Sequence, residues 1–350
     1  MSRRLSCPTH LQETCLLLLI DSSNLEEQCA AAGCASLRAH KEGNSKQTAV
    51  LRASNDFFPR NPVSHTIHIA AVAYNSVFLG EFMLPDWGMF HSLHPAGEYH
   101  GSDRAISGGP IYVSDAPGKH DFELLKKIVL PDGSVLRPRL PGRPTKDCLF
   151  TDPARDGGAA WSFVEKKTMF HQTGTEALTY GVKGSNVHLI SEAATDPEWN
   201  GDCVVYCHAS GDIVVLPNGA ALPVSLKVLE QDILTVSLIK DLAPGFRFAP
   251  IGLIDMFNGG AAVEGLTYHL LDGAKMLGGD YSASSSEAVG LVCMEVRGCG
   301  RFGAYSSVRP RKCMLGSTQV EFSYESSSGL AILQLKDMPK ERVHRIVFEL

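Results

Sequence analysis

The stretch over residues 50–60, VLRASNDFFPR, holds the side chains best suited to chemistry. A short apolar run ends at Arg52, and the carboxylate of Asp56 follows four residues later. At the carboxyl end of a strand in a β/α architecture, such an arginine can hold a ligand oxygen and such an aspartate can deliver a proton. The alternative is an exposed ion pair that contributes less than about 1 kcal/mol. The neighbouring segments bear on this choice.

Two more carboxylates follow apolar runs in the same way. The run at 82–84 leads into Asp86 and Trp87, and the run at 108–113 leads into Asp115. An aromatic ring beside a carboxylate is typical of sugar sites, because the ring covers the C–H face of the sugar while the carboxylate accepts hydroxyl hydrogen bonds. A buried Trp beside a turn Asp remains an equal alternative.

The apolar patterning predicts the elements that position these residues. Pro59 and Pro62 are expected to keep the stretch after Asp56 out of a helix. Three strand–helix units in succession are typical of a β/α barrel or an open α/β sheet. The expected elements are a strand over 48–51, a buried helix over 66–79, a helix that carries His91, His94 and His100, a strand over 108–115 and a helix over 122–129.

The pattern changes after residue 131. A linker at 140–144 is followed by short alternating runs that Gly, Asn and Asp residues separate, which predicts an antiparallel β-sandwich. The closely spaced glycines at 298–303 are predicted to form tight turns or bulges, since no helix follows them to make a phosphate site. The runs used for this prediction lie at 203–206, 212–219, 222–229 and 329–335.

Composition limits the classes of function. The 350 residues are 44% hydrophobic and 20% charged, which suits one large or two medium globular domains. The net charge of -6 argues against nucleic-acid and membrane partners. The apolar run at 15–20 is too short for a signal peptide or a spanning helix, so we expect a cytoplasmic protein, with a plastid as the alternative.

Metal and cofactor binding are not expected. The ten cysteines are predicted to be reduced thiols. Cys203 and Cys207 lack a second ligand pair at zinc spacing, and strand alternation explains them equally well. His91 and His94 are three residues apart but have no third ligand placed beside them, so they are interpreted as polar residues at a helix start.

Seven segments together resemble one family of carbohydrate enzymes. The sequence is similar to the plant raffinose synthase, seed imbibition protein and alkaline α-galactosidase group of glycoside hydrolase family thirty-six. The similar segments begin at residue 46 and extend toward the C-terminus. They are RASNDFFPR (52–60), FMLPDW (82–87), MFHSLHP (89–95), IYVSD (111–115), LPDGSVL (130–136), LPGRPT (140–145) and FAPIGLIDMFN (248–258).

The resemblance implies a fold of the α/β plus all-β class. Residues 46–145 would form a partial (β/α)8 TIM barrel, about its last three β/α units. Residues 146–350 would form a C-terminal antiparallel β-sandwich domain. Residues 1–45 lie outside the similar segments and are expected to be a divergent N-terminal segment.

The resemblance also implies galactosyl chemistry with retention of configuration. The family's Arg-x-x-x-Asp motif falls on Arg52 and Asp56, so Asp56 would be the acid/base and Arg52 would bind a galactosyl hydroxyl. Asp86, Trp87 and Asp115 would complete the sugar-binding set. The expected partners are the small sugars galactinol, sucrose and raffinose, with no cofactor.

The chain departs from the family in its expected catalytic machinery. Retaining chemistry needs a second carboxylate about 5 to 5.5 Å from the first, acting as nucleophile. The family's nucleophile lies in a Lys-x-Asp motif upstream of the acid/base, and no such motif precedes Arg52. We therefore expect the nucleophile and about five barrel strands to be absent from these 350 residues.

Single positions depart from the family as well. Asn55 and Gly88 stand where the family has aspartates, and Asp103 lies where the family is apolar. The stretch 156–161 is expected to join two family segments directly, with the intervening strands missing. Two hypotheses follow: a galactinol–sucrose galactosyltransferase or alkaline α-galactosidase that is inactive alone in this truncated form, or a non-catalytic family remnant with at most weak sugar binding.

Overall fold

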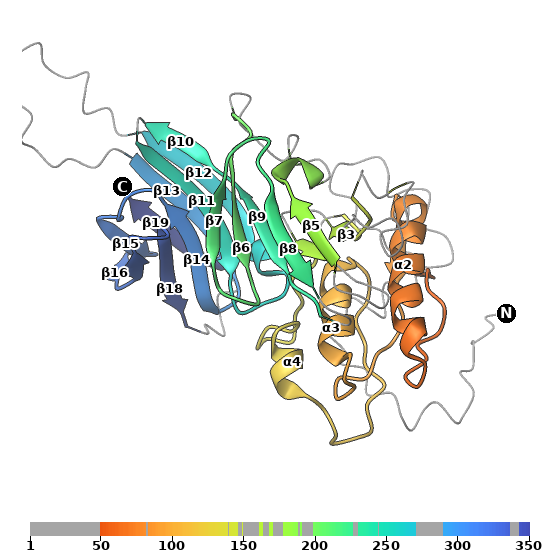
Figure 1. Ribbon diagram of the computed structural model, residues 1–350. Helices are drawn as coiled ribbons and strands as arrows, with labels where there is room; N and C mark the ends of the chain where they lie inside the picture. Colours follow the sequence, from red (N-terminus) through yellow and green to blue (C-terminus); the bar gives the residue numbers. More distant parts are fainter. Residues whose placement is uncertain are drawn as a thin grey trace, which may run out of the picture.

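A computed structural model of the chain describes most of its residues from Val50 onward (Figure 1). The expected N-terminal segment 1–45 and the expected junction at 156–161, apart from Trp161, lie outside the described residues. The described ranges are 50–81, 83–138, 140–145, 149, 161–163, 168–170, 178–187, 190, 199–226, 230–243, 245–270, 290–336 and 343–350.

The N-terminal part of the described chain alternates short strands with helices. Strand β1 pairs with β2 in parallel, with Arg52 opposite Asp86. A parallel bridge joins Phe90 to Val113, and this single bridge is all that the structure forms of the strand expected over 108–115. The elements are β1 Val50–Arg52, α2 Pro62–Leu79, β2 Leu84–Asp86, α3 Gly97–Ile106 and α4 Phe122–Lys126.

The two longer helices begin at places that the prolines determine. Helix α2 starts at Pro62, four residues earlier than expected, because a proline at the first helical position loses no hydrogen bond and has a suitable φ. Helix α3 starts only at Gly97, so the expected helix through His91 and His94 is wrong. Pro95 explains this, since a residue before proline avoids helical backbone angles.

Helix α4 is shorter than the helix expected over 122–129. The side chain of Asp121 accepts a hydrogen bond from the Leu124 amide at 3.0 Å and so caps its N-terminus. The helix ends at Lys126, and Pro131 follows closely. None of the helices among the described residues combines the length and apolar character that crossing a membrane requires.

The remainder of the described chain is built of strands. Two short 3-10 helices, η3 Gly184–Asn186 and η4 Gly259–Ala262, interrupt them. The first strands are β3 Trp161–Phe163, β4 Thr168–Phe170, β5 Leu178–Val182, β6 Cys203–Cys207, β7 Ile213–Leu216, β8 Leu222–Leu226, β9 Leu234–Leu238 and β10 Lys240–Ala243. The later strands are β11 Phe246–Leu253, β12 Val263–Leu270, β13 Gly290–Arg297, β14 Gly300–Ser306, β15 Lys312–Leu315, β16 Thr318–Val320, β17 Ser323–Glu325, β18 Leu330–Leu335 and β19 Val343–Glu349.

These strands form antiparallel sheets that stack on one another (Figure 1), which confirms the antiparallel prediction for this part of the chain. The sheet β10-β11-β14-β18-β17 faces the sheet β12-β13-β19-β15-β16 across one core, as in a sandwich. The opposite face of the first sheet packs on the sheet β3-β4-β9-β6-β7 through Val204 and Ala249. The pair β5 and β8 covers the last sheet in turn.

Large apolar side chains hold the central core together. Phe248, Phe302 and Phe348 are fully buried between the two facing sheets, and burial of each ring contributes roughly 2 to 3 kcal/mol. The turn from β13 to β14 uses Gly298 and Gly300, whose φ angles of 91° and 114° suit glycine. The glycine-rich stretch is therefore a tight turn, as predicted.

Candidate functional site

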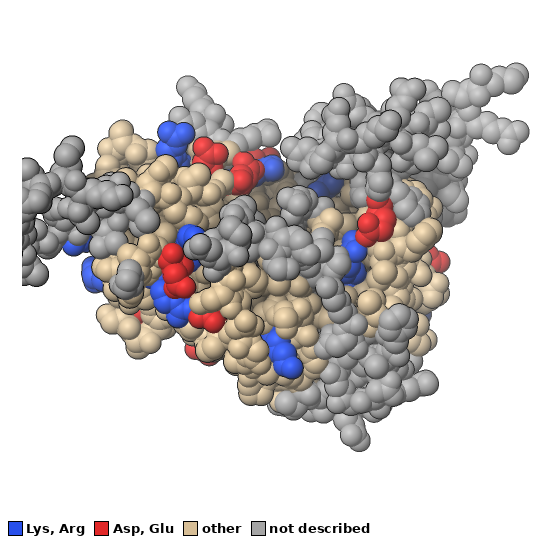
Figure 2. All heavy atoms as spheres, turned by 90° about the horizontal axis from the view of Figure 1, so that it is seen from above, with Lys and Arg blue, Asp and Glu red and all other residues tan. Residues whose placement is uncertain are grey.

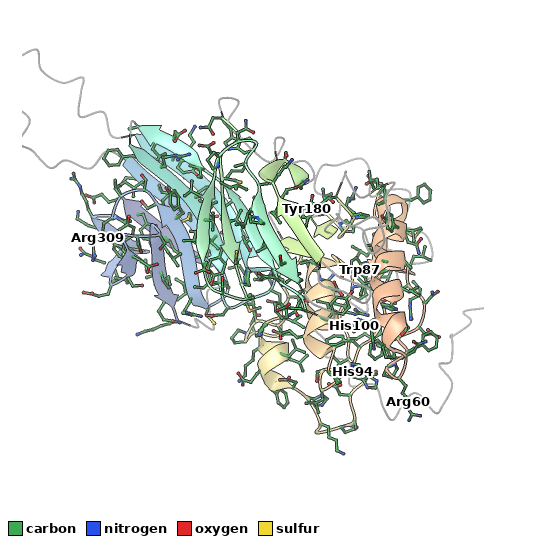
Figure 3. All side chains as sticks on the ribbon, in the orientation of Figure 1. Arg60, Trp87, His94, His100, Tyr180 and Arg309 are labelled. Carbon is green, nitrogen blue, oxygen red and sulfur yellow. The ribbon has the colours of Figure 1, made fainter. Side chains whose placement is uncertain are left out.

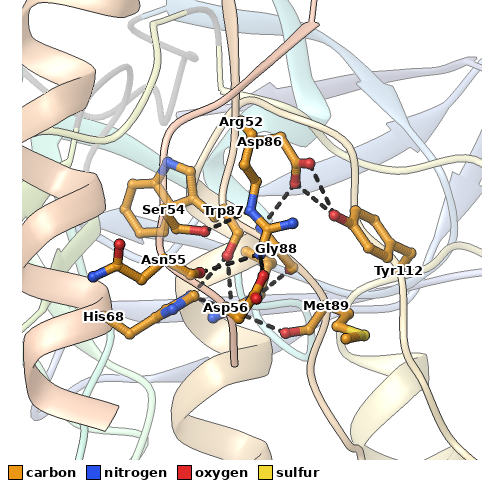
Figure 4. Close-up of polar contacts among 11 residues, drawn as sticks. Arg52, Ser54, Asn55, Asp56, His68, Asp86, Trp87, Gly88, Met89 and Tyr112 are labelled. Carbon is orange, nitrogen blue, oxygen red and sulfur yellow. Dashed lines mark hydrogen bonds and ion pairs between the residues drawn. The ribbon is translucent and has the colours of Figure 1, made fainter. Parts of the chain in front are cut away.

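Arg52 and Asp56 meet at the end of β1 (Figure 4). Nη2 of Arg52 donates to Oδ1 of Asp56 at 3.1 Å and to the Asn55 carbonyl at 3.1 Å, and Nε donates to Oγ of Ser54 at 3.0 Å. The Asp56 side chain is 75% exposed, so the pair lies open to solvent. An exposed pair of this kind contributes little to stability. Because the two side chains are 39% and 75% exposed, both groups are accessible to a ligand.

Asp86 lies on the neighbouring strand, directly opposite Arg52. The Tyr112 hydroxyl lies 2.9 Å from each carboxylate oxygen of Asp86, and the Gly88 amide donates to Oδ1 at 2.8 Å (Figure 4). Burial, and next the negative charge of Asp86, raise the pKa of Tyr112, so this phenol stays protonated and donates. The carboxylate of Asp86 is thereby held in one orientation beside the Arg52–Asp56 pair.

Gly88 leaves room for the Arg52 guanidinium. Its φ of +76° belongs to the left-handed region that favours glycine. A Cβ atom added there would lie 3.0 Å from Nη2 of Arg52 and 3.1 Å from Oγ of Ser54. The position of Arg52 therefore depends on the absence of a side chain at residue 88.

Trp87 is fully buried rather than exposed at the site. Its Nε1 donates to Oγ of Ser76 on α2 at 3.2 Å, and its relative exposure is 0%. Figure 3 places its side chain beside α2. The ring offers no face to a sugar, so the structure matches the alternative of a buried Trp beside a turn Asp.

Asp115 is also buried, at 4% exposure. Its carboxylate accepts from the amide and the hydroxyl of Ser92 at 2.8 and 2.5 Å, and Oδ2 lies 3.1 Å from Nδ1 of His120. The Ser92 hydroxyl in turn accepts from the Asp121 amide at 2.8 Å, just ahead of α4. These contacts connect the turn after β2 to the start of α4, which is a structural use of the carboxylate.

A fully buried arginine supports the turn that follows Asp86. Arg104 on α3 donates from Nε to the Gly88 carbonyl at 3.1 Å and from Nη2 to the Trp87 and Met89 carbonyls at 2.9 and 3.3 Å. Burial lowers its pKa to about 10, so it remains a cation at neutral pH. One guanidinium thus fixes three consecutive carbonyls directly behind the site.

Two histidines continue this network in a defined direction. Nη1 of Arg104 lies 2.9 Å from Nδ1 of His100, and Nε2 of His100 lies 2.7 Å from Nδ1 of His65. A guanidinium can only donate, so Nδ1 of His100 accepts and Nε2 carries the proton that His100 donates to His65. His100 is therefore neutral in this arrangement.

Phe57, the residue after Asp56, is enclosed by imidazole rings. Its ring centroid lies 4.9 to 5.8 Å from the rings of four histidines, and its side chain is 5% exposed. The four are His65, His91, His94 and His100. Because His65 belongs to α2 and His100 to α3, these contacts join the loop that carries Asp56 to both helices. Figure 3 labels His94 and His100 of this cluster.

We expect acid to destabilise the protein through its buried histidines. Burial lowers the pKa of His65 and His100, and lowers that of His68 and of His208, which follows β6, to about 4. At pH values below about 6.5, histidines of the unfolded chain bind protons that the same histidines of the folded chain do not bind. The free energy of unfolding therefore falls as the pH drops from about 6.5 toward 4.

The pH dependence of urea unfolding measures this effect. Each histidine adds up to about 1.4 kcal/mol per pH unit within the window. His68→Gln removes one titrating group and should reduce the slope by about one proton. His269→Gln replaces an exposed histidine of β12 by the same residue and is the matched control. An equal slope in His68→Gln would contradict the assignment.

A buried carboxylate on α3 has no role in these contacts. Asp103 is 0% exposed, and neither of its carboxylate oxygens has a hydrogen-bond partner among the described residues. Burial raises its pKa well above the ordinary value.

The site offers two groups that are open to solvent, the carboxylate of Asp56 and the guanidinium of Arg52. The described residues contain no group of three or more His, Cys, Asp and Glu side chains arranged for a metal ion. Cys203 and Cys207 are free thiols of β6. Hydroxyl recognition by Arg52 and Asp86, with proton transfer at Asp56, is the chemistry that this geometry can support.

The structure brings together some of the predicted residues and separates others. Arg52, Asp56 and Asp86 gather at the ends of β1 and β2, whereas Trp87 and Asp115 are buried beside them. The sequence analysis missed Tyr112 and Arg104. Tyr112 lies in the similar segment IYVSD just before Asp115, and Arg104 follows His100 at the i, i+4 spacing of one helix face, so both had a detectable signal.

Comparison with known proteins gives a consistent family match. The family described as raffinose synthase or seed imbibition protein Sip1 matches residues 24–158 and 157–335. The match begins well before residue 46, where the similar segments were expected to begin. Its two parts meet at 157–158, within the stretch where two family segments are expected to join.

Individual relatives agree with this match. The chain is 55% identical to a probable galactinol–sucrose galactosyltransferase 6 of Arabidopsis thaliana, over 91% of the chain and 44% of the relative. It is 36% identical to a galactinol–sucrose galactosyltransferase of Pisum sativum and 29% identical to a stachyose synthase of that plant, over 74% and 82% of the chain. These matches cover 33% and 35% of the two pea proteins, so the chain spans less than half the length of these relatives.

Proposed function

The chain belongs to the raffinose synthase or seed imbibition protein family, and from this we propose that it carries the acid/base portion of a galactosyl-transfer site. The reaction would move galactose from galactinol to sucrose with retention of configuration. The observation that carries the proposal is the gathering of Arg52, Asp56 and Asp86 at the ends of two parallel strands.

Each of these groups has a role in the proposed reaction. Asp56 would protonate the departing group and then accept a proton from the incoming sucrose hydroxyl, as a retaining acid/base does. Arg52, which already donates to the Asp56 carboxylate, would bind a galactosyl hydroxyl. Asp86, oriented by Tyr112 and Gly88, would accept a hydrogen bond from another hydroxyl.

Trp87 and Asp115 would act on the sugar only indirectly. Both side chains are buried, which favours structural roles for them. Trp87 would pack against α2, and Asp115 would hold Ser92 and His120 in place. The same arrangement supports, as a proposal, a partial β/α barrel over residues 46–145. Its support is the parallel pair β1–β2 together with the parallel bridge from Phe90 to Val113.

Galactosyl transfer by the purified 350-residue chain tests the proposal. Galactinol and sucrose are supplied, and raffinose and free galactose are measured by chromatography. Where the chain turns over substrate, Asp56→Asn is expected to lower the rate by at least about a hundredfold, because general acid/base catalysis contributes roughly 10² to 10⁴. Asp241→Asn is the matched control, because Asp241 is a carboxylate of β10 that is distant in sequence from Arg52 and Asp56.

A second function is favoured by the state of the other carboxylates. Asp86 is held by Tyr112 and Gly88, and Asp115 is buried against Ser92, so the described site presents one solvent-open carboxylate, Asp56. An acid/base carboxylate without a second carboxylate as nucleophile cannot form the glycosyl-enzyme intermediate. The second proposal is therefore a non-catalytic family member that binds galactosides weakly.

Calorimetric titration with galactinol separates the two functions. Heat of binding that Arg52→Ala abolishes, without any product, would support the binding function and reject catalysis by this chain. Product formation that Asp56→Asn eliminates would support the catalytic one. Neither binding nor turnover by the folded chain would reject both proposals.

A further inference from the structure

Phe58 exposes its ring two residues after Asp56. It is 53% exposed, whereas Phe57, which lies between the two, is 5% exposed. Residues 55–58 form neither helix nor turn. Successive side chains of an extended segment point to opposite sides, so residues two apart share a side. Asp56 and Phe58 therefore face solvent together on one side of the loop that leads to α2.

Hydrogen bonds fix the backbone at this ring and just after it. The Phe58 carbonyl accepts from the Asn61 amide and from Oγ of Ser64, both at 3.1 Å. Nε2 of His94 donates to the next carbonyl, that of Pro59, at 2.8 Å. A ring that is held in this way loses little conformational freedom when a ligand binds, which favours affinity.

The rings that lie closest to Phe58 in the sequence and in the neighbouring strand end are buried. Trp87 and Phe90 are 0% exposed, and Phe57 is enclosed by histidines. A sugar site pairs a carboxylate with the open face of an aromatic ring. The role that the sequence analysis offered to Trp87 therefore falls to Phe58, which lies beside the open carboxylate of Asp56.

The order along the chain places Phe58 farther from the strand end than Asp56. Arg52 ends β1, and Asp56 and then Phe58 follow as the chain runs toward α2. Figure 3 places Arg60 near the lower end of α2, below Trp87. In a β/α unit, the loop residues beyond the strand ends line the mouth of the site. Because the acid/base contacts the oxygen between the transferred sugar and the second group, a ring beyond it borders that second group.

The charged groups around the ring suit a neutral ligand that has hydroxyl groups. Asp56 precedes the ring and pairs with Arg52 at 3.1 Å, and Arg60 follows the ring. Hydroxyls both donate and accept, so they can bind a carboxylate and a guanidinium at once. Among the described side chains that Figure 2 colours, seen from above, charges of both signs are likewise interspersed rather than gathered into a patch of one sign.

We propose that Phe58 is the platform on which the acceptor sugar, sucrose, stacks beside Asp56. This inference rests on the proposed function, in which Asp56 is the acid/base of galactosyl transfer to sucrose. The Phe58 ring would cover the C–H face of one sucrose ring, while Asp56 and Arg60 would bind sucrose hydroxyls. Phe58 would therefore determine the affinity for the acceptor, and with it the ratio of transfer to hydrolysis.

Titration of the 350-residue chain with sucrose, followed by saturation-transfer NMR, tests this role. Phe58→Ala removes the ring, and we expect the dissociation constant for sucrose to rise by at least about tenfold, as for other aromatic residues that dominate a binding site. Phe58→Tyr keeps the ring and should bind sucrose like the parent. Where the chain turns over galactinol, Phe58→Ala should raise the KM for sucrose and preserve the kcat.

Phe122→Ala is the matched control. It removes a 60% exposed ring from the first residue of α4 and should leave the dissociation constant for sucrose unchanged. Galactose separates the inference from the proposed function, because it has no acceptor ring. Binding of galactose should be lost in Arg52→Ala and kept in Phe58→Ala.

Each other outcome decides against one of the two proposals. Sucrose binding that depends on Phe58, without any binding of galactose, would reject the proposed function and keep the platform. The platform is overturned if the parent does not bind sucrose, if Phe58→Ala binds sucrose like the parent, or if Phe122→Ala weakens binding equally. A markedly lower melting temperature of Phe58→Ala would also overturn it, since the ring would then pack against the protein.

Discussion

Arg104→Met is expected to lower the free energy of unfolding by about 3 kcal/mol or more, because several buried acceptors lose their donor at once. The carbonyls of Gly88 and Met89 would keep no other donor among the contacts described, and Nδ1 of His100 would also be left without one. Each orphaned acceptor costs roughly 1 to 3 kcal/mol. Methionine nearly fills the volume, so loss of packing contributes less.

An opposing effect limits this loss. Removing a buried cation relieves the cost of its desolvation, and that burial is visible in the pKa of Arg104, lowered to about 10. Six hydrogen bonds to the guanidinium offset this cost in the native protein, so we expect the orphaned acceptors to dominate. Urea unfolding followed by tryptophan fluorescence measures the difference. Greater stability in Arg104→Met would show that desolvation is the larger effect.

Arg104→Lys distinguishes the hydrogen-bond geometry from the charge. Lysine keeps the positive charge but presents its donors from a single atom, so it cannot reach the carbonyls of Trp87, Gly88 and Met89 together. We expect a loss intermediate between the parent and Arg104→Met. A lysine variant as stable as the parent would mean that the charge alone supports the turn.

Asp103→Ala is expected to raise the free energy of unfolding by about 1 to 3 kcal/mol at pH 7. The carboxylate is fully buried and has no hydrogen-bond partner, so its burial is a net cost, and alanine is the best helix former for the interior of α3. Because the folded pKa is raised, the folded chain holds a proton that the unfolded chain releases once pH rises above about 4.

The gain in Asp103→Ala should therefore grow as pH rises from about 4 to 8. Chemical denaturation of parent and variant at both pH values measures it, and the histidine contribution cancels in the comparison. Glu98→Ala, which removes an exposed carboxylate from the same helix, is the control and should change stability by less than about 1 kcal/mol. A gain that is equal at the two pH values would show that Asp103 is not the group that titrates.

Local sequence determined much of the fold. Strand β6 over Cys203–Cys207 and strand β18 over Leu330–Leu335 follow from alternating runs between turn residues, and the tight turn at 298–300 follows from its glycines. The ion pair of Arg52 and Asp56 was one of two alternatives that the spacing allowed. These features depend on neighbours in the sequence, so the sequence was sufficient to predict them.

Burial was decided by the tertiary structure. Asp103 and Arg104 are adjacent in one helix, yet one faces no partner and the other reaches three carbonyls, because consecutive helical residues point in different directions and meet different segments. Trp87 and Asp86 separate in the same way at the end of β2. The sequence by itself determined which residue types and local elements were present, whereas only packing between distant segments decided which side chains remain open to a ligand.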